Sequence, residues 1–400
     1  MAEFRTIDDL NVIGKRVLLR GDLNVPLQDG VVTDTLRLDR LAGTIFELAE
    51  RGARIVVISH LGRPKGKPVP ELSLKPIAEA LSKAIGGRPV AFAGACIGAP
   101  AEAVVGALEN GAVAVLENLR FESGEEANDP EFAGALAALG DYYVNDAFSV
   151  SHRAHASIVA IAHLLPAAAG RALQAEIDAL ERALGNPERP LAALVGGAKV
   201  STKIGILENL AGRVDSLVIG GAMANTFLLA AGMPIGASLA EPEMIETAGR
   251  VVAAAKRAAC AILLPIDAVI APALEPGVTS SIVPIDAVPP DQMILDIGPE
   301  TTQSLIVAIS GWRTLVWNGP LGAFETPPFD AGTTAIARAA ARCTRTGILT
   351  TVAGGGDTVA ALAHTRASQD FTHISAAGGA FLEWLEGKDL PGLAVLRKPG

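Results

Sequence analysis

Short apolar runs, rich in β-branched residues, alternate along the whole chain with longer segments of helical period. Alternation of this kind is typical of α/β proteins, in which helices cover both faces of a parallel sheet. The sequence therefore predicts two doubly wound parallel-sheet domains. The predicted strands are RVLLR (16–20), RIVVISH (54–60), AVAVLEN (112–118) and YYVND (142–146) in the first half, and LAALVGG (191–197), SLVIGG (216–221), AILLPID (261–267), TLVWNGP (314–320), ILTTVAGGG (348–356) and HISAAGG (373–379) in the second.

A single amphipathic helix is expected between the two halves. Its apolar positions Leu173, Ile177, Leu180 and Leu184 recur at helical spacing, and the helix-breaking segment GNPERP follows them. This pattern predicts an N-terminal domain over residues 1–170, a linker helix over 171–184 and a C-terminal domain over 185–386. We expect a cleft and a hinge between the two domains.

The composition narrows the classes of function. Of the 400 residues 50% are apolar and 19% are charged, so the chain can build large cores and is not disordered. Only 4% are aromatic, which disfavours a base-stacking platform for nucleic acid. The formal net charge of −10 repels nucleic-acid phosphates and anionic lipid. An anionic small molecule would therefore need a local cluster of basic side chains.

Targeting signals and cysteine usage favour a reducing, cytoplasmic environment. The first twenty residues lack the apolar core of a signal peptide. Residues 217–240 carry no charge, but glycines, polar residues and a proline interrupt them, so they are interpreted as a buried strand and helix, not a membrane span. Cys96, Cys260 and Cys343 lie far apart without metal-ligand spacing, as expected for small buried hydrophobes.

Charged and polar side chains follow the predicted strands of the first half. In open α/β sheets ligands bind beyond the carboxyl ends of the strands, so these residues are candidates for one site. Any one of them alone is more typical of a solvated surface, but together they predict a cationic cluster for a small, multiply charged anion. The residues are Arg20, Asp22, Asn24, His60, Arg63, Arg120, His152, Arg153 and His155, with Arg37 joining them if its helix folds over the same edge.

The second half offers glycines at the corresponding positions, in LVGGAKVSTK, VIGGAMAN, VAGGGDTVA and SAAGGAF. Backbone N–H groups at such strand-to-helix turns can face phosphate, although tight packing alone can also require glycine. Lys199 and Lys203 are spaced i, i+4 on the expected helix, hence on one face. Asp357 is either a helix N-cap or a ligand of the magnesium ion that accompanies a nucleotide. Glu325 is either a surface carboxylate or a partner of ribose hydroxyls.

The familiar nucleotide-binding motifs are absent from the sequence. The nearest approach to a Walker loop, GRPKGK at residues 62–67, is one residue short, and no G-x-G-x-x-G follows a strand. The kinase motifs HRD and DFG are also missing. A nucleotide would therefore have to bind by another scheme.

An ordered set of motifs over essentially the whole chain closely resembles the phosphoglycerate kinase family. The motifs are RGDLNVP, SHLGRP, LENLRF, NDAFSVSHRAHAS, GGAKVSTKI, VIGGAMANTF, WNGPLGAFE, AGGGDT and GGAFLEWLEGK. The resemblance implies a two-domain, hinge-bending monomer that transfers a phosphoryl group reversibly between 1,3-bisphosphoglycerate and ADP, giving 3-phosphoglycerate and MgATP, in glycolysis and gluconeogenesis. It further implies direct in-line transfer after domain closure, and a tail over 387–400 that returns to the N-terminal domain.

The resemblance also implies roles for individual residues. The phosphoglycerate site is expected at Asp22, Leu23, Asn24, Arg37, His60, Leu61, Gly62, Arg63, Arg120, His152 and Arg153. The nucleotide site is expected at Gly196, Gly197, Lys199, Lys203, Gly220, Gly221, Asn318, Pro320, Glu325, Gly354, Gly355, Gly356, Asp357 and Thr358, with Asp357 on Mg²⁺. The groups expected to act on the transferring phosphoryl are Arg37, Lys199, Lys203, Gly378 and Gly379.

Two other functions remain open on the sequence alone. Another ATP-dependent carboxylate-phosphorylating kinase of the same architecture would share both sites, and a noncatalytic anion-binding protein would need only the cationic cluster. The chain departs from the family pattern at Ser375-Ala376-Ala377, where Ser-Thr-Gly is usual. The lost hydroxyl and the added methyl group bear on how closely this loop meets the transferring group, and we expect the change to be tolerated.

Overall fold

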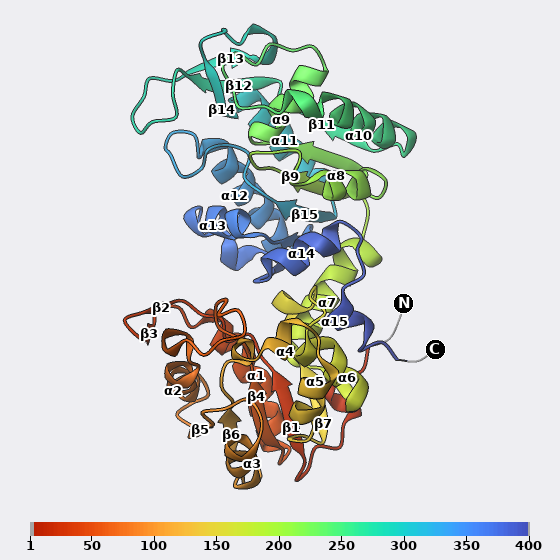
Figure 1. The fold of residues 1–400 in the computed structure, drawn as a ribbon. Helices are drawn as coiled ribbons and strands as arrows, with labels where there is room; N and C mark the ends of the chain where they lie inside the picture. The colour runs from red at the N-terminus through yellow and green to blue at the C-terminus, as the bar shows by residue number, and fades with distance from the viewer. Residues whose placement is uncertain (1–3, 399–400) are drawn as a thin grey trace. The chain divides into compact units, whose positions relative to one another are not determined.

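The computed structural model describes residues 4–398, which divide into two compact units. The first unit contains the described residues through Ile177 together with those from Asp389 onward, and the second is Asp178–Lys388. Each unit is built around its own sheet (Figure 1). The α/β fold with two parallel sheets is therefore confirmed.

All strand pairs in the sheet of the first unit are parallel. Within the described residues this sheet has six strands, in the spatial order β5 (Val90–Phe92), β6 (Val113–Val115), β4 (Arg54–Ile58), β1 (Arg16–Arg20), β7 (Tyr142–Asn145) and β8 (Ala167–Ala169). The two short outer strands β5 and β8 were not predicted. In β1 and β4 every residue after the first is buried, as expected for strands covered on both faces.

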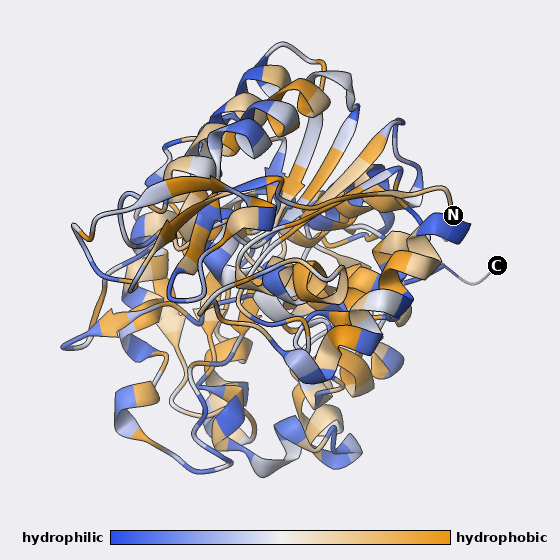
Figure 2. Cartoon of the chain, turned by 90° about the horizontal axis from the view of Figure 1, so that it is seen from above, coloured by the Kyte–Doolittle hydropathy of each residue, from blue (hydrophilic) through white to orange (hydrophobic). Residues whose placement is uncertain are grey.

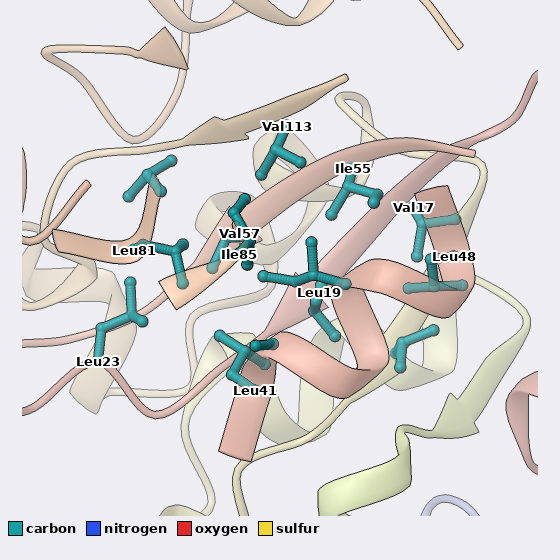
Figure 3. Packing of buried hydrophobic residues seen from close by; sticks show 14 of the residues in the cluster. Val17, Leu19, Leu23, Leu41, Leu48, Ile55, Val57, Leu81, Ile85 and Val113 are labelled. Atoms are coloured by element: carbon teal, nitrogen blue, oxygen red, sulfur yellow. The ribbon is translucent and has the colours of Figure 1, made fainter. Parts of the chain in front are cut away.

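Alternate residues of the central strands pack against one layer of helices. Val17 and Leu19 of β1 lie in the same buried cluster as Leu41 and Leu48 of α1 (Leu36–Glu50), as Figure 3 shows. The alternate apolar residues of β1 thus pack against the apolar face of α1. This packing fixes α1, and therefore Arg37 in its first turn, relative to the strand ends.

The remaining helices of the first unit surround the sheet (Figure 1). They are α2 (Lys75–Ala84), α3 (Ala99–Gly106), α4 (Ser123–Glu126), α5 (Pro130–Ala137), α6 (Ile161–Leu164), the start of α7 (Arg171–Leu180) and α15 (Pro391–Ala394), with a small hairpin of β2 (Leu27–Gln28) and β3 (Val31–Val32). In the C-terminal segment, Gly392 N donates to Ser151 O at 2.8 Å, and Phe4 forms an antiparallel bridge with Arg397. Residues 399 and 400 of the predicted tail lie outside the described residues.

The second unit repeats the architecture with one addition. Its described residues form a six-stranded parallel sheet, in the order β11 (Ala261–Leu263), β10 (Ser216–Ile219), β9 (Leu191–Val195), β15 (Thr314–Asn318), β16 (Thr350–Ala353) and β17 (His373–Ile374). An antiparallel sheet of β13 (Ser281–Pro284), β12 (Asp267–Ala271) and β14 (Met293–Ile297) accompanies it. The sequence pattern did not predict this second sheet.

The helices of the second unit range from an uncharged, largely buried segment at 222–230 to amphipathic segments such as 245–257, and Figure 2 shows the hydropathy of the chain residue by residue. These helices are α8 (Ile204–Ala211), α9 (Ala222–Ala230), α10 (Ile245–Arg257), α11 (Pro299–Gly311), α12 (Ala331–Arg345), α13 (Gly356–His364) and α14 (Gly378–Leu385). The uncharged stretch at 217–240 is the strand β10 followed by α9. Among the described residues no helix is both long and apolar enough to span a membrane.

The predicted linker helix begins at Arg171 as α7 and continues after Leu180 as a π-helical turn, η6 (Glu181–Gly185). Its apolar positions Leu173 and Leu184 are buried. The division between the two units falls inside α7, after Ile177. The chain therefore passes from one unit to the other through this helix.

Candidate active site

In the first unit the loop after β1 is tied to the first turn of α1. The Arg37 guanidinium lies 2.9 Å from the Asp22 carboxylate and donates to Asn24 O at 3.0 Å. Ser149 Oγ donates to the same carboxylate at 2.6 Å. The Arg37 side chain remains 32% exposed, so it is held in place and can still reach a ligand.

Loops after three parallel strands meet at Gly62. Asn24 Oδ1, after β1, accepts a hydrogen bond from Gly62 N at 2.9 Å. Arg120, after β6, donates to Gly62 O at 2.7 Å, and Gly62 itself follows β4 with a φ of +60°. Arg120 is buried, and the Glu126 carboxylate, 3.2 Å from Arg120 Nε, neutralises part of its positive charge. The structure thus brings Asp22, Asn24, Arg37, Gly62 and Arg120 into one connected cluster.

The other predicted residues of this site differ in their exposure. His60 is 4% exposed, Arg63 is exposed in the same loop, and Arg153 and His152 are half-buried in the turn after Ser151. Burial and the charges of nearby arginines hold the pKa of His60 well below its usual 6.5. Leu23 and Leu61 belong to the core, so only their backbone groups could meet a ligand.

Arg20 and His155 do not join the open cluster, contrary to the expectation from their position after strands. Arg20 is fully buried and His155 is 7% exposed. A buried carboxylate, Glu125, lies 3.6 Å from His155 and carries the negative charge that balances Arg20. Burial raises the pKa of Glu125, but hydrogen bonds and the Arg20 charge outweigh this effect, so the pKa is lowered.

In the second unit the strand ends are packed backbone against backbone. A Cβ on Gly196 would lie 1.9 Å from Pro320 O, and Gly221 adopts a φ of +67° beside Gly197. The N–H groups of Gly196 and Gly221 donate to Asn318 O and Leu321 O. These two N–H groups are therefore used within the sheet edge and are not available to phosphate. The same holds for Gly220, which donates to Val195 O, and Gly354, which donates to Trp317 O.

Lys199 and Lys203 do not share a helix face, because α8 starts only at Ile204. Lys199 is exposed in the preceding turn, whereas Lys203 is the N-cap residue and turns inward. Its Nζ donates to Gly196 O and to Asn318 O, at 3.1 Å in the second case. Burial lowers the pKa of Lys203 to about 8, although the Asp357 carboxylate opposes this shift.

A cavity of about 450 Å³ opens in the second unit beside these strand ends. Of the predicted nucleotide residues, Gly197, Gly221, Pro320, Glu325 and Asp357 line it. The remaining predicted residues of that site do not. An apolar cavity of this size with a few polar groups at its rim suits a small organic ligand.

The N-terminus of α13 borders this cavity at Asp357, which is exposed. Asn318 Nδ2 donates to Gly354 O at 2.7 Å, and Gly355 leads into the helix with a φ of +98°. Thr358 is 1% exposed and its hydroxyl accepts from Gly319 N, so this side chain serves the packing of the turn. First-turn N–H groups of a helix have no partner inside the helix and attract anions.

The N-terminus of α14 carries Gly378 and Gly379. Ala377, its N-cap residue, has an ordinary φ of −99° and donates from its N–H to Ser375 Oγ at 3.2 Å. A methyl group in place of the usual glycine is therefore accommodated without backbone strain. Among the described residues no heavy atom beyond the helix's own neighbours lies within 4 Å of a Cβ built on Gly378, so this turn is open.

Comparison with known proteins identifies the family. The family model described as phosphoglycerate kinase matches residues 7–388. The chain belongs to the phosphoglycerate kinase family. It is 58% identical over 399 residues to the phosphoglycerate kinase of Chelativorans sp. (strain BNC1), covering 100% of both chains. It is 57% identical over 396 residues to that of Rhizobium meliloti (strain 1021), covering 99% of both.

Solved structures agree with this assignment. The phosphoglycerate kinase of Coxiella burnetii superposes with a TM-score of 0.91 at 41% identity, covering 98% of this chain and 99% of that one. The enzyme of Pyrococcus horikoshii OT3 gives 0.77 at 30% identity, covering 98% of both chains. The chain is therefore an ATP/ADP-dependent kinase that transfers a phosphoryl group reversibly in glycolysis.

Several residues that line the cavity of the second unit were not predicted from the sequence. Leu239, Leu274, Met293, Leu295 and Ile297 give the cavity its apolar wall. The last three lie on β14, whose antiparallel pairing with β12 only the folded chain reveals. The run MILDI was a possible signal, since it is apolar and precedes a Gly-Pro turn.

Proposed function

We propose that each unit holds one substrate of the reversible transfer between 1,3-bisphosphoglycerate and ADP. The first unit binds 3-phosphoglycerate or its bisphosphate, and the second binds ADP or ATP. The observation that carries this division is a contrast between the two sheet edges. Guanidinium groups gather at the first, where they suit phosphate and carboxylate. The second edge has an apolar cavity, a helix N-terminus and a half-buried lysine, which together suit a nucleoside attached to phosphates.

Phosphoryl transfer needs alignment of two oxygens and compensation of the charge on the moving group, so no nucleophilic side chain is required. We assign charge compensation to Arg37 in the first unit and to Lys199 and Lys203 in the second, together with the amides of Gly378 and Gly379. Lys203 is held by two carbonyl oxygens, Gly196 O and Asn318 O, and so approaches a phosphate in a fixed position. Lys199 is exposed and free to follow the ligand.

Magnesium is the metal that a nucleotide would bring, and the residues of this unit fit it. Within residues 4–398 no three His, Cys, Asp or Glu side chains gather as a metal cage. Mg²⁺ bound with a nucleotide typically uses one or two carboxylates, phosphate oxygens and water, so the exposed carboxylate of Asp357 at the cavity rim is sufficient. Such an ion neutralises phosphate charge. Asp357→Asn should raise the Mg²⁺ concentration needed for half-maximal activity while leaving metal-free ADP binding unchanged by calorimetry.

In-line transfer requires that the two bound substrates meet, so we propose that a closing motion precedes the chemistry and that the 171–184 segment takes part in it. Each ligand alone offers contacts to one unit only, so both together should favour closure most. Small-angle scattering should show the largest fall in radius of gyration in the doubly liganded state. An unchanged radius in all states would contradict the proposal.

We further propose a cytoplasmic monomer. Cys96, Cys260 and Cys343 are free thiols in the structure, which suits a reducing compartment. Light scattering coupled to gel filtration tests the oligomeric state, and a stable dimer would overturn this part of the proposal.

The activity itself is tested by ATP formation from ADP and enzymatically generated 1,3-bisphosphoglycerate. We expect ATP with this acyl phosphate and none with acetyl phosphate, because the guanidinium cluster selects a donor with a second phosphate. Equal activity with both donors would indicate a different carboxylate kinase.

A further inference from the structure

A fully buried arginine lies at the carboxyl end of β1, behind the candidate phosphoglycerate site. The Arg20 guanidinium donates to Ser157 Oγ at 3.1 Å, to Ser59 Oγ at 3.3 Å and to Gly21 O. Its Nη2 lies 3.0 Å from His60 Nδ1. A buried cation with this many contacts fixes the groups around it, since breaking any contact leaves a desolvated donor.

The counter-charge of Arg20 reaches it through a hydroxyl. Ser157 Oγ donates to Glu125 Oε1 at 2.6 Å, and Ser157 N donates to Glu125 Oε2 at 3.0 Å. Because the Ser157 hydroxyl donates its one proton to Glu125, its oxygen accepts the hydrogen bond from Arg20. The direction of every hydrogen bond from Glu125 to the guanidinium is therefore determined, and Glu125 is itself 0% exposed.

The direction of the next contact follows from the chemistry of arginine. A guanidinium has five N–H donors and no acceptor, so Arg20 is the donor in its contact with His60. His60 Nδ1 must then carry the lone pair. A neutral imidazole has one N–H, which is consequently on Nε2. An imidazolium would place a second N–H and a like charge against Arg20 at 3.0 Å.

Other charges around His60 act in the same sense. Beyond Arg20 on β1, the charged or titratable groups that face it are Arg120, Arg37 and His155, from three further segments. Burial is the largest cause of the lowered pKa of His60, and these groups, all of which carry or can carry positive charge, lower it further. The ring is therefore neutral through the physiological range.

We propose that the buried series Glu125–Ser157–Arg20 is a positioning device that locks His60 as the neutral Nε2–H tautomer. His60 then offers phosphoglycerate one hydrogen-bond donor of fixed direction, and its charge does not change with pH. Arg20 and Glu125 act through His60 and do not touch the substrate. The use of His60 rests on the function proposed above, whereas the lock itself is a property of the free protein.

The lock is tested directly by nitrogen NMR of protein carrying ¹⁵N-labelled histidine. The chain has 6 histidines, and His60→Gln identifies the signals of interest. In the free wild-type enzyme we expect the two-bond coupling pattern of the Nε2–H tautomer, unchanged between pH 5.5 and 8. A protonated Nδ1, or an imidazolium at pH 6 to 7, would overturn the proposal, and the measurement itself is made on the wild-type protein.

A charge-balanced variant tests the cause. Arg20→Gln with Glu125→Gln removes both buried charges together, which avoids leaving either one unpaired. We expect the pKa of His60 to rise in this variant, because one of the positive charges that lower it is gone, and kcat/KM for 3-phosphoglycerate to gain a pH dependence that the wild type lacks. The KM for 3-phosphoglycerate should rise at least ~10-fold, the scale of one charge-assisted hydrogen bond, with the KM for ATP within about twofold. An unchanged tautomer and pH profile would overturn the role of Arg20.

The matched control lies at the other end of the same strand. Arg16 pairs with Asp141 at 2.8 Å, and Arg16→Gln with Asp141→Asn makes the same chemical change there. The His60 signals and both KM values should stay as in the wild type. Altered signals in this control would mean that any change on β1 moves His60, which would contradict a specific lock.

Addition of 3-phosphoglycerate separates this inference from the proposed function. A shift of the His60 Nε2 signal supports both. If the free enzyme has the expected tautomer and the ligand leaves its signals unmoved, the substrate role of His60 fails and the lock has no function in catalysis.

Discussion

The first unit gathers charged side chains from separate loops at the edge of its sheet, whereas the second unit packs backbone against backbone at the corresponding edge. Arg37, Asp22 and Arg120 contact one another or neighbouring loops through side-chain atoms. In contrast, Gly196 leaves no room for a methyl group beside Pro320. A site made of side chains should be sensitive to their truncation, and a site made of backbone to the addition of atoms.

Buried charge distinguishes the two units in the same way. Arg20 in the first unit has a carboxylate partner, Glu125, in the layer behind the site. Lys203 in the second unit has carbonyl oxygens for hydrogen-bond partners, and burial lowers its pKa to about 8. The first arrangement keeps charge fixed across pH, and the second allows it to change.

The largest effect is expected from truncating Arg37. Arg37→Ala removes a preorganised positive charge from the first unit, and kcat should fall at least ~100-fold. Because its ion pair with Asp22 is partly exposed, the free energy of unfolding should change by less than ~1 kcal/mol. Steady-state kinetics and denaturant unfolding measure the two quantities. Arg40→Ala, one turn further along α1, is the control and should retain kcat; a normal kcat in Arg37→Ala would remove this residue from charge compensation.

The converse change in the second unit adds a methyl group. In Gly196→Ala the new Cβ would lie 1.9 Å from Pro320 O, and overpacking of this kind costs about 1–3 kcal/mol. The unfolding temperature should fall by roughly 3–10 °C in calorimetry. Gly378→Ala provides the comparison, because its turn is open and its stability should stay within about 0.5 kcal/mol. Equal stability of both variants would refute the backbone-built edge.

The smallest effect concerns the pH dependence of Lys203. With a pKa of about 8 the lysine loses its charge as pH rises, so kcat/KM for ADP should fall about fivefold from pH 8 to pH 9. The free energy of unfolding should instead rise with pH. Since the folded pKa lies below 10.5, the unfolded chain binds more protons between pH 8 and 10.5, and stability rises across that window.

A pair of lysine variants isolates this titration. Lys203→Met should lack both pH effects, whereas Lys199→Gln, which alters the exposed lysine, should keep them. A wild-type profile that stays flat to pH 9.5 would show that the buried environment does not act on Lys203 as described.

The sequence predicted the first site better than the second for a physical reason. Charged residues directly after apolar runs are visible in the sequence, and parallel strands bring their carboxyl ends to one edge. Thus Asp22, Asn24 and Arg120 could be grouped before the fold was known. Their position after a strand does not tell whether a side chain turns outward, which is why the burial of Arg20 was missed.

The second site depends on contacts between distant segments. The i, i+4 spacing of Lys199 and Lys203 suggested one helix face, yet α8 starts after both because the tight strand edge holds Lys203 against Gly196 and Asn318. The apolar wall on β14 arises from its pairing with β12, which no local pattern specifies. Local sequence could predict the glycine turns here but not which of their amides the sheet edge uses.

The division of substrates between the units is tested most directly by titration calorimetry of two variants with two ligands. Arg63→Ala truncates an exposed arginine of the first unit, and Lys203→Ala truncates the half-buried lysine of the second. We expect Arg63→Ala to weaken 3-phosphoglycerate binding at least ~10-fold with ADP binding within twofold, and Lys203→Ala to do the opposite. Equal losses of both ligands in either variant would contradict the assignment of one substrate to each unit.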